Sequence, residues 1–186
     1  MNQVDFSDIP GTHKLKSKKS CDERGFFEKL FDKTEFVSKN LNTALDSIAI
    51  SSNTMAGTLR GLHFQTAPYS EEKLVACLSG SIFDVVVDLR FDSPTFCKWA
   101  SVLLNGDDDQ VIYLPKGVAH GFQTLVDDSR VLYAITTTYN PASGYSLKYL
   151  DLTLNIDWPI PVSVVSKKDA EGLSLAEAVD LFKDYN

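Results

Sequence analysis

Residues 72–90 read EKLVACLSGSIFDVVVDLR and place two apolar runs on either side of Ser79-Gly80. In the second run, residues 81–90, both alternating sets of positions are largely apolar, as in a strand that is covered on both faces. Ser-Gly is a common turn pair, and its position predicts a hairpin connection between the two runs. The stretch therefore indicates the centre of a β-sheet.

Further short apolar runs with turn residues between them lie on both sides of this stretch. They are SIAISS (47–52), GTLRGLHFQ (57–65), KWASVLL (98–104), DQVIYLP (109–115) and RVLYAITTTY (130–139). Such spacing is typical of an all-β sandwich or barrel, and Asn105-Gly106 predicts a second hairpin connection. We predict one helix, at residues 174–184, where Ser174 and Glu177 form a capping box.

Length and composition predict one domain over residues 1–186, with residues 1–20 as an N-terminal extension. The chain has 186 residues, 44% of them hydrophobic, and a formal net charge of −7. Without a basic run the chain is poorly suited to nucleic acid, and we expect no such partner. No segment reaches the roughly 20 apolar residues that span a bilayer, and no signal peptide is visible. We therefore expect a cytoplasmic protein with no membrane partner.

The cysteines and histidines are few. Cys21, Cys77 and Cys97 show no CxxC spacing, so neither a disulfide framework nor a thiolate metal site is expected. Of the three histidines, His13 lies in a polar stretch, whereas His63 and His120 lie in apolar surroundings. Both could simply be hydrogen-bonded core or rim residues. His63 could instead be a general base, which would need a carboxylate from a distant segment.

The stretch TLRGLHFQ (58–65) brings an arginine and a histidine onto one strand. Strict alternation would send Arg60 and His63 to opposite faces of the sheet. We predict that Gly61 marks a bulge, so that both side chains reach one concave site.

Two further polar residues share strand faces with apolar neighbours. Lys73 has the parity of Val75 and Cys77, and Tyr133 has that of Ile135, Thr137 and Tyr139. A strand-end lysine usually extends to water and a buried tyrosine usually packs. Alternatively, Lys73 could stabilise an oxyanion and Tyr133 could donate a proton.

Taken together, several blocks resemble one family and follow its order from about residue 20 to residue 175. The blocks are DERGFFEKLF (22–31), TLRGLHFQ (58–65), EEKLVACLSGSIFDVVVDLRFDSPTFCKW (71–99), QVIYLPKGVAHGF (110–122), YAITTTYNP (133–141), IDWPIP (156–161) and SKKDA (166–170). They resemble the dTDP-4-dehydrorhamnose 3,5-epimerases, nucleotide-sugar epimerases with a cupin-type jelly roll. The resemblance implies an all-β jelly-roll sandwich or barrel with a short C-terminal helix.

The resemblance also implies a role for each site residue. The catalytic set would be a His63–Asp169 base pair, Lys73 beside the ketone oxygen of the sugar, and Tyr133 as the acid on the opposite face. The substrate-binding candidates are Arg24, Phe27, Arg60, His120 and Tyr139. The implied substrate is a nucleotide-diphosphate 4-keto sugar, inverted at C3, C5 or both. The family uses no metal or organic cofactor and forms homodimers whose N-terminal strands help build the neighbouring subunit's site.

The chain departs from the family pattern where recognition residues are expected. The usual Q-x-N is replaced by Ile48-x-Ile50, two expected glutamates fall at Lys29 and Gly144, and W-N-D-P has become YLDL at 149–152. Loss of polar groups that bind one sugar reduces the preference for it. We therefore expect altered sugar or nucleotide specificity.

Two alternatives from other functional classes remain open. One is a catalytically inactive sugar-nucleotide-binding protein, against which the presence of the whole proton-transfer set argues. The other is a metal-dependent cupin enzyme, which the absence of an HxH pair or a clustered ligand set disfavours.

Overall fold

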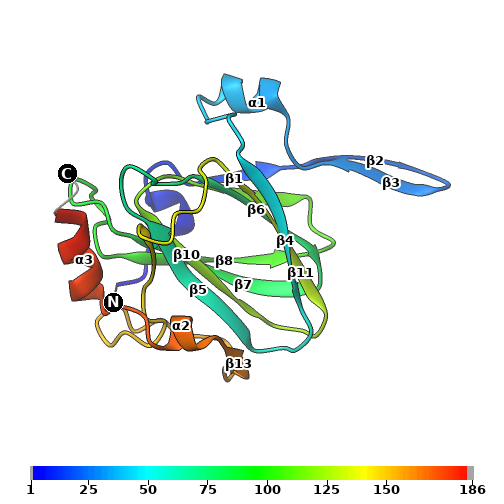
Figure 1. The fold of residues 1–186 in the computed structure, drawn as a ribbon. Coiled ribbons are helices and arrows are strands. Elements are labelled where there is room, and N and C mark those ends of the chain that lie inside the picture. Colours follow the sequence, from blue (N-terminus) through cyan, green and yellow to red (C-terminus); the bar gives the residue numbers. More distant parts are fainter. Residues whose placement is uncertain (1, 184–186) are drawn as a thin grey trace.

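Two β-sheets packed face to face form the body of the protein, and the computed structural model describes residues 2–183 of it (Figure 1). The first sheet has the order β1-β9-β6-β11-β4, with β1 His13–Lys16, β9 Gln110–Leu114, β6 Lys73–Ser79, β11 Ser129–Ile135 and β4 Ser47–Asn53. The second has the order β12-β5-β10-β7-β8, with β12 Gly144–Ser146, β5 Thr58–Gln65, β10 Val118–Thr124, β7 Ser81–Asp88 and β8 Trp99–Asn105. These pairings are antiparallel, and β13, Val164–Val165, adds a short parallel pairing to β5. The predicted jelly-roll sandwich is confirmed.

The two predicted hairpin connections are wrong. Strands β6 and β7 flank Ser79-Gly80 but belong to different sheets, and β8 and β9 flank Asn105-Gly106 in the same way. The two corners contact each other, because the Gly106 amide donates a 2.9 Å hydrogen bond to the Gly80 carbonyl. Turn residues specify a chain reversal but not the sheet that the next strand joins. In a jelly roll the chain crosses between the sheets at such corners.

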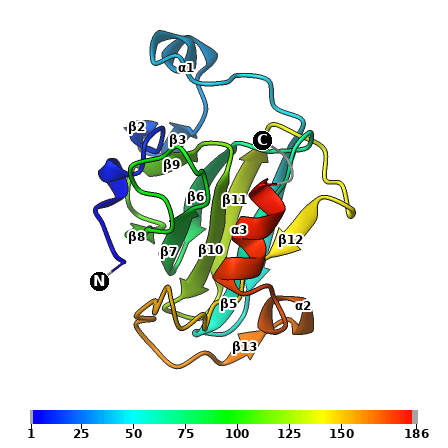
Figure 2. The same ribbon diagram turned by 90° about the vertical axis from the view of Figure 1, so that its left-hand side faces the viewer.

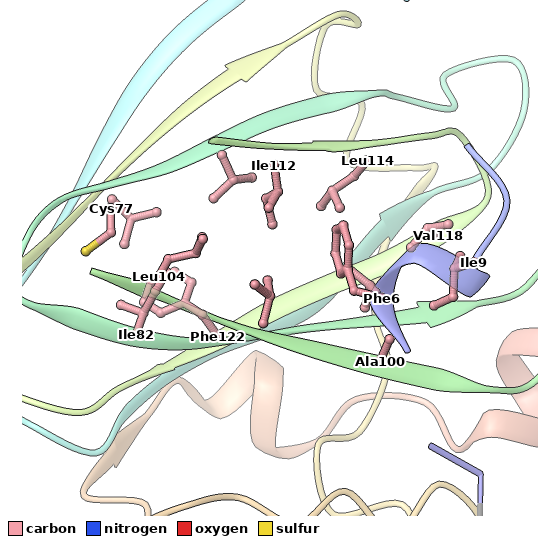
Figure 3. Packing of buried hydrophobic residues seen from close by; sticks show 14 residues of the cluster. Phe6, Ile9, Cys77, Ile82, Ala100, Leu104, Ile112, Leu114, Val118 and Phe122 are labelled. Atoms are coloured by element: carbon pink, nitrogen blue, oxygen red, sulfur yellow. The ribbon is translucent and has the colours of Figure 1, made fainter. Parts of the chain in front are cut away.

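The main hydrophobic core lies between the two sheets (Figure 3). Its fully buried members include Ile82 and Phe122 from the second sheet and Ile112 from the first. Strand β7 lies between β10 and β8, as its apolar sequence predicts. Tyr133 packs against the edge of this core, which therefore supports one side of the site described below.

The C-terminal helix α3, Leu175–Lys183, covers the outer face of the second sheet (Figure 2). Its capping box is present, because the Glu177 amide donates to Ser174 Oγ at 3.3 Å and Glu177 Oε2 accepts from the Ser174 amide at 2.8 Å. Phe182 packs against Phe64 of β5 with ring centroids 5.4 Å apart. Residue 184, the predicted end of the helix, lies outside the described residues. Within residues 2–183, no helix has both the length and the apolar character needed to cross a membrane.

The N-terminal 40 residues form both core and projecting structure. The expected N-terminal extension includes, within residues 2–20, the 3-10 helix η1, Phe6–Asp8, and β1, and it buries Phe6 and Ile9 in the core. Strands β2, Lys18–Asp22, and β3, Gly25–Lys29, form a separate two-stranded sheet that extends away from the sandwich (Figure 1). Helix α1, Lys33–Ser38, follows it and buries Phe36 against the outer face of the first sheet. Helix α2, Lys167–Ala170, is a single turn beside β5.

Two adjacent leucines on β8 test the assignment of the core. Leu104 is 0% exposed and Leu103 is 51% exposed. Leu104→Ala should lower the free energy of unfolding by about 2–5 kcal/mol, because it leaves a cavity between the sheets. Leu103→Ala is the matched control and should change it by roughly 0.5 kcal/mol or less. Urea denaturation of both variants measures the difference, and equal effects would contradict the assigned sandwich interior.

Candidate active site

A cavity of about 520 Å³ is bounded by both sheets, within the size range of small-molecule sites. Strands β4, β6 and β11 of the first sheet contribute one wall, and β5 and β10 of the second contribute the other. Seven of the nine candidate site residues meet around it. Arg60, His63, Lys73, His120, Tyr133 and Tyr139 line the cavity, and Asp169 is bonded to one of the lining residues.

The bulge predicted at Gly61 brings Arg60 and His63 to the same cavity. On β10, His120 pairs with His63 and Phe122 pairs with Arg60, so the register shifts by one residue between these pairs. Gly61 has φ +110°, and a Cβ there would lie 2.6 Å from the His120 carbonyl oxygen. A side chain at this position would therefore force the two strands apart.

His63 and Asp169 form the hydrogen-bonded pair that the family resemblance implied. His63 Nε2 lies 2.7 Å from Asp169 Oδ1, although the residues are 106 positions apart. Ser166 caps α2 by accepting from the Asp169 amide at 3.1 Å, which places Asp169 in the first turn. With Nε2 bonded to the carboxylate, Nδ1 is the ring nitrogen that remains to accept a proton from a substrate.

The Asp169 carboxylate is buried yet stays ionised. Burial by itself would raise its pKa, but the hydrogen bond and charge of His63 and the hydrogen bonds from Ser146 and Gly61 outweigh it and lower the pKa to about 2. Ser146 Oγ donates at 2.9 Å to the same oxygen that faces His63. The carboxylate can therefore orient the imidazole and stabilise the imidazolium.

Lys73 and Tyr133 lie on the wall formed by the first sheet. Ile135 pairs with Lys73 and Tyr133 pairs with Val75 across β6 and β11, so these side chains share the face that we predicted. Lys73 Nζ lies 2.7 Å from Glu71 Oε1 and 3.5 Å from the His63 carbonyl oxygen. Burial, and then the negative charge of Asp84, raise the pKa of Tyr133 above its usual value of 10.0. The phenol is therefore protonated at neutral pH.

His120 belongs to a second histidine–carboxylate pair. Its Nε2 lies 2.8 Å from Asp84 Oδ2, and both side chains are buried. Burial raises the pKa of Asp84, against the opposing charge of His120. The ring of His120 contacts Tyr133 edge to face with centroids 5.9 Å apart. His120 thus links a buried carboxyl group to the tyrosine.

Arg60 and Tyr139 lie toward the mouth of the cavity. Arg60 Nε donates a 2.7 Å hydrogen bond to Asn53 Oδ1, and within residues 2–183 its two terminal nitrogens form no hydrogen bond or ion pair. Tyr139 is 59% exposed, and Lys168 Nζ lies 5.7 Å from its ring centroid. A Cβ on Gly144 would lie 2.6 Å from Tyr139 Cε2, so the ring fills space that a side chain at 144 would need.

Arg24 and Phe27 do not reach the cavity of their own chain. Arg24 lies in the turn between β2 and β3 and pairs with Asp22, and Phe27 is 72% exposed on β3. Both belong to the projecting two-stranded sheet (Figure 1). Of the two isoleucines that replace Q-x-N, Ile50 lines the cavity, whereas Ile48 is not among its lining residues.

Several residues of the site escaped sequence reasoning. Four of them are Glu71, Asp84, Ser146 and Lys168. Glu71 has the strand parity of Lys73, which could have indicated it. Asp84 interrupts an apolar strand, and a buried carboxylate needs a partner, which is a usable signal. Nothing local distinguishes Ser146 and Lys168 from surface residues.

Within residues 2–183, no three His, Cys, Asp or Glu side chains converge as ligands of a metal ion.

Comparison with protein families identifies the family to which the chain belongs. The model of the dTDP-4-dehydrorhamnose 3,5-epimerases matches residues 7–177. The chain belongs to the dTDP-4-dehydrorhamnose 3,5-epimerase family. This family consists of carbohydrate epimerases, which are isomerases, and its jelly roll is cupin-like.

Individual members of the epimerase family match over most of their length. The dTDP-4-dehydrorhamnose 3,5-epimerase of Mycobacterium tuberculosis is 44% identical over 156 residues, covering 82% of this chain and 76% of that protein. The 4-keto-6-deoxy sugar epimerase NovW of Streptomyces spheroides superposes with a TM-score of 0.87 at 34% identity, covering 93% and 87% of the two chains. ChmJ, a 3'-monoepimerase of Streptomyces bikiniensis solved with dTDP-quinovose, gives 0.86 at 30% identity, covering 93% and 88%.

The pKa of Asp169 generates a prediction about stability. Since its folded-state pKa of about 2 lies below the ordinary value of 3.8, the ionised group stabilises the fold above about pH 4, and this contribution is lost as the pH falls toward 2. The free energy of unfolding of the wild type should exceed that of Asp169→Asn by an amount that shrinks by about 2 kcal/mol over this interval.

Urea denaturation between pH 2 and pH 6 measures this difference. The exposed Asp157 supplies a matched control, because Asp157→Asn removes the same charge outside the site. A difference between wild type and Asp169→Asn that does not change with pH would contradict the assigned ionisation.

Proposed function

We propose that this epimerase inverts C3, C5 or both in a nucleotide-diphosphate 4-keto-6-deoxyhexose, in deoxysugar biosynthesis. The observation that carries the proposal is the hydrogen bond between His63 and Asp169 at a cavity that Lys73 and Tyr133 also line. A base held by a carboxylate, a cation and a protonated phenol are the groups that proton exchange next to a ketone requires.

His63 acts as the base in this proposal. A ketone at C4 acidifies the hydrogens on C3 and C5, so Nδ1 of His63 can remove one of them as a proton. The electron pair of the broken C–H bond then forms the C–C double bond of an enolate, and the negative charge moves to the C4 oxygen. Asp169 stabilises the imidazolium that results, because its ionised carboxylate lies 2.7 Å from Nε2.

Lys73 and Tyr133 complete the inversion. The ammonium group of Lys73 faces the developing oxyanion and lowers the energy of the enolate. Tyr133 then donates its hydroxyl proton to the carbon from the face opposite His63. The raised pKa of Tyr133 supports this role, because the phenol still holds its proton at neutral pH. The His120 ring, which is hydrogen-bonded to Asp84, contacts the tyrosine ring edge to face.

Arg60 and Tyr139 are proposed to hold the nucleotide diphosphate. Guanidinium groups form bidentate hydrogen bonds with phosphate oxygens, and exposed aromatic rings stack on bases. Arg60 and Tyr139 line the same cavity as the proton-transfer residues. The relative ChmJ binds dTDP-quinovose, which supports a nucleotide sugar as the ligand here.

The sugar or nucleotide is proposed to differ from that of the rhamnose pathway. Gly144 stands where the family pattern has a glutamate, and Ile50 lines the cavity where an asparagine is expected. A site without these polar groups cannot discriminate by hydrogen bonds to them. Lys29, another departure from the family pattern, lies on the projecting sheet.

The projecting β2–β3 sheet is proposed to complete the cavity of a second copy in a homodimer. Phe26 and Phe27 are 63% and 72% exposed, which is unusual for large apolar side chains on one short sheet. Arg24 lies at its tip, where it can reach a phosphate group in the partner's site. The exposed Ile48 on edge strand β4 offers apolar surface for the same contact.

Hydrogen exchange at the sugar tests the proposed chemistry. The wild type should introduce solvent deuterium at C3 or C5 of at least one member of a panel of dTDP-, CDP- and GDP-4-keto-6-deoxy sugars, followed by NMR. His63→Ala should slow this exchange by about 10²–10⁴-fold, the usual contribution of a positioned proton-transfer group. His13→Ala is the control and should exchange at the wild-type rate, because His13 lies on β1, outside the cavity.

The panel also separates the alternatives. If the wild type exchanges no hydrogen in any of these sugars, the protein is not an epimerase of this class, and an inactive binding protein becomes the better account. If the rhamnose precursor alone is turned over, the proposed change of specificity is wrong.

Mixing two impaired variants tests the shared site. Arg24→Ala should weaken substrate binding and His63→Ala should strongly slow proton removal, so each homodimer is impaired. Co-expression of the two should restore roughly a quarter of the wild-type sites, because each mixed dimer has one cavity with both an intact His63 and the partner's intact Arg24. Exchange no faster than that of the separate variants would count against an arm that crosses between subunits.

A further inference from the structure

Glu71 is an acidic side chain in the cavity, and the proposed reaction gives it no role. It lies on the connection between β5 and β6 and lines the cavity, and its side chain is only 11% exposed. Carboxylates are rarely this buried unless they are paired. A negative charge beside a site that must build an enolate calls for an explanation, because like charges repel there.

Both oxygens of Glu71 have fixed partners. Oε1 lies 2.7 Å from Lys73 Nζ, whose side chain is 9% exposed, and Oε2 accepts a 2.8 Å hydrogen bond from Gln65 Nε2. Gln65 Nε2 also donates to the Tyr69 carbonyl at 3.1 Å. The other end of the amide, Gln65 Oε1, accepts from the Asn140 amide at 2.7 Å. The amide orientation of Gln65 is thereby determined, and with it the position of the carboxylate.

From this network we infer that Glu71 is the positioning residue for Lys73, which it holds at the wall of the cavity where the C4 oxygen of the sugar would lie. The inference rests on the proposed function. A lysine side chain has four rotatable bonds and loses much entropy when it is fixed. Within the described residues, Lys73 Nζ forms one further hydrogen bond besides its contact with Glu71. That bond, to the His63 carbonyl oxygen, is long at 3.5 Å.

Positioning outweighs repulsion between Glu71 and the enolate. The ammonium group balances the charge of the carboxylate and the Gln65 amide donates a hydrogen bond to it, so little of its charge acts on the substrate. Its removal would leave a nearly buried ammonium without an anion, and the flexible side chain would turn toward other acceptors. The enolate oxygen would then lose its cation.

The same network joins Lys73 to the mouth of the cavity. Gln65 binds the Asn140 amide next to Tyr139, and Tyr139 packs on Gly144. Glu71 and Gln65 therefore connect the ring proposed to hold the nucleotide with the cation proposed to face the ketone. A shift of about 1 Å in such a group can reduce a rate by about 10²-fold.

A double-mutant cycle on deuterium exchange tests the inference. The variants are Glu71→Gln, Lys73→Met and the double variant, each with the sugar that the wild type exchanges. Glu71→Gln should lower the exchange rate constant at saturation by about 10²-fold with a KM within a few-fold of the wild type. In the Lys73→Met background the same substitution should have no further effect, because Glu71 acts through Lys73.

Controls separate this inference from a fold defect and from the proposed function. Glu72→Gln changes the adjacent carboxylate, which bonds Asn42 outside the cavity, and should exchange normally. Binding of the nucleoside diphosphate (dTDP, CDP or GDP) of the sugar that the wild type exchanges measures whether each variant keeps its site. Should Glu71→Gln fail to bind it, Glu71→Asp keeps the charge but is one methylene shorter, and it should also slow exchange.

The outcomes are distinct. Wild-type exchange in Glu71→Gln, a faster rate, or effects of the two substitutions that multiply in the double variant would overturn the inference and leave the proposed function intact. No exchange in the wild type itself would overturn the proposed function and this inference with it.

Discussion

The hydrogen bond between His63 and Asp169 is the contact on which the site depends. It joins a strand of the second sheet to helix α2 near the C-terminus, and it requires an ionised carboxylate in a buried position. Burial alone would raise the pKa of that carboxyl group, and the hydrogen bonds from His63, Ser146 and Gly61 together lower it to about 2. The Gly61 bulge that supplies one of them also turns His63 toward the cavity. The orientation of His63 and the ionisation of Asp169 thus depend on the same few residues.

The sandwich places the proposed base on one wall of the cavity and the proposed acid and cation on the other. The proposed base, His63, and Arg60 lie on β5, while Lys73 and Tyr133 lie on β6 and β11. A sugar ring held between the walls would have one face toward His63 and the other toward Tyr133, which is the arrangement that inversion requires. Two carboxyl groups lie behind these residues. Asp84 bonds His120, whose ring contacts Tyr133, and Glu71 bonds Lys73 directly. Neither needs to touch the substrate to affect the rate.

Most of the strands and part of the site can be predicted from the sequence, for identifiable physical reasons. The strands of alternating or continuous apolar residues, the capping box of α3 and the Gly61 bulge follow from local rules, and the structure confirms them. Strand β10, Val118–Thr124, was missed because it is buried throughout yet contains His120 and Gln123, whose partners lie in other segments. Asp169 came from the family resemblance, since no local pattern links residues 106 positions apart. The hairpin prediction fails at the two corners because turn residues do not specify which sheet the next strand joins.

The central claim is that the His63–Asp169 pair removes a carbon-bound hydrogen next to a ketone. Its most direct test is a single-turnover comparison of 4-keto sugar nucleotides with hydrogen or deuterium at C3 or C5. The account predicts that deuterium at the inverted carbon slows turnover and is replaced by hydrogen from water, and that Asp169→Asn lowers both rates. Equal rates for the two isotopes, with the label retained in an inverted product, would contradict it.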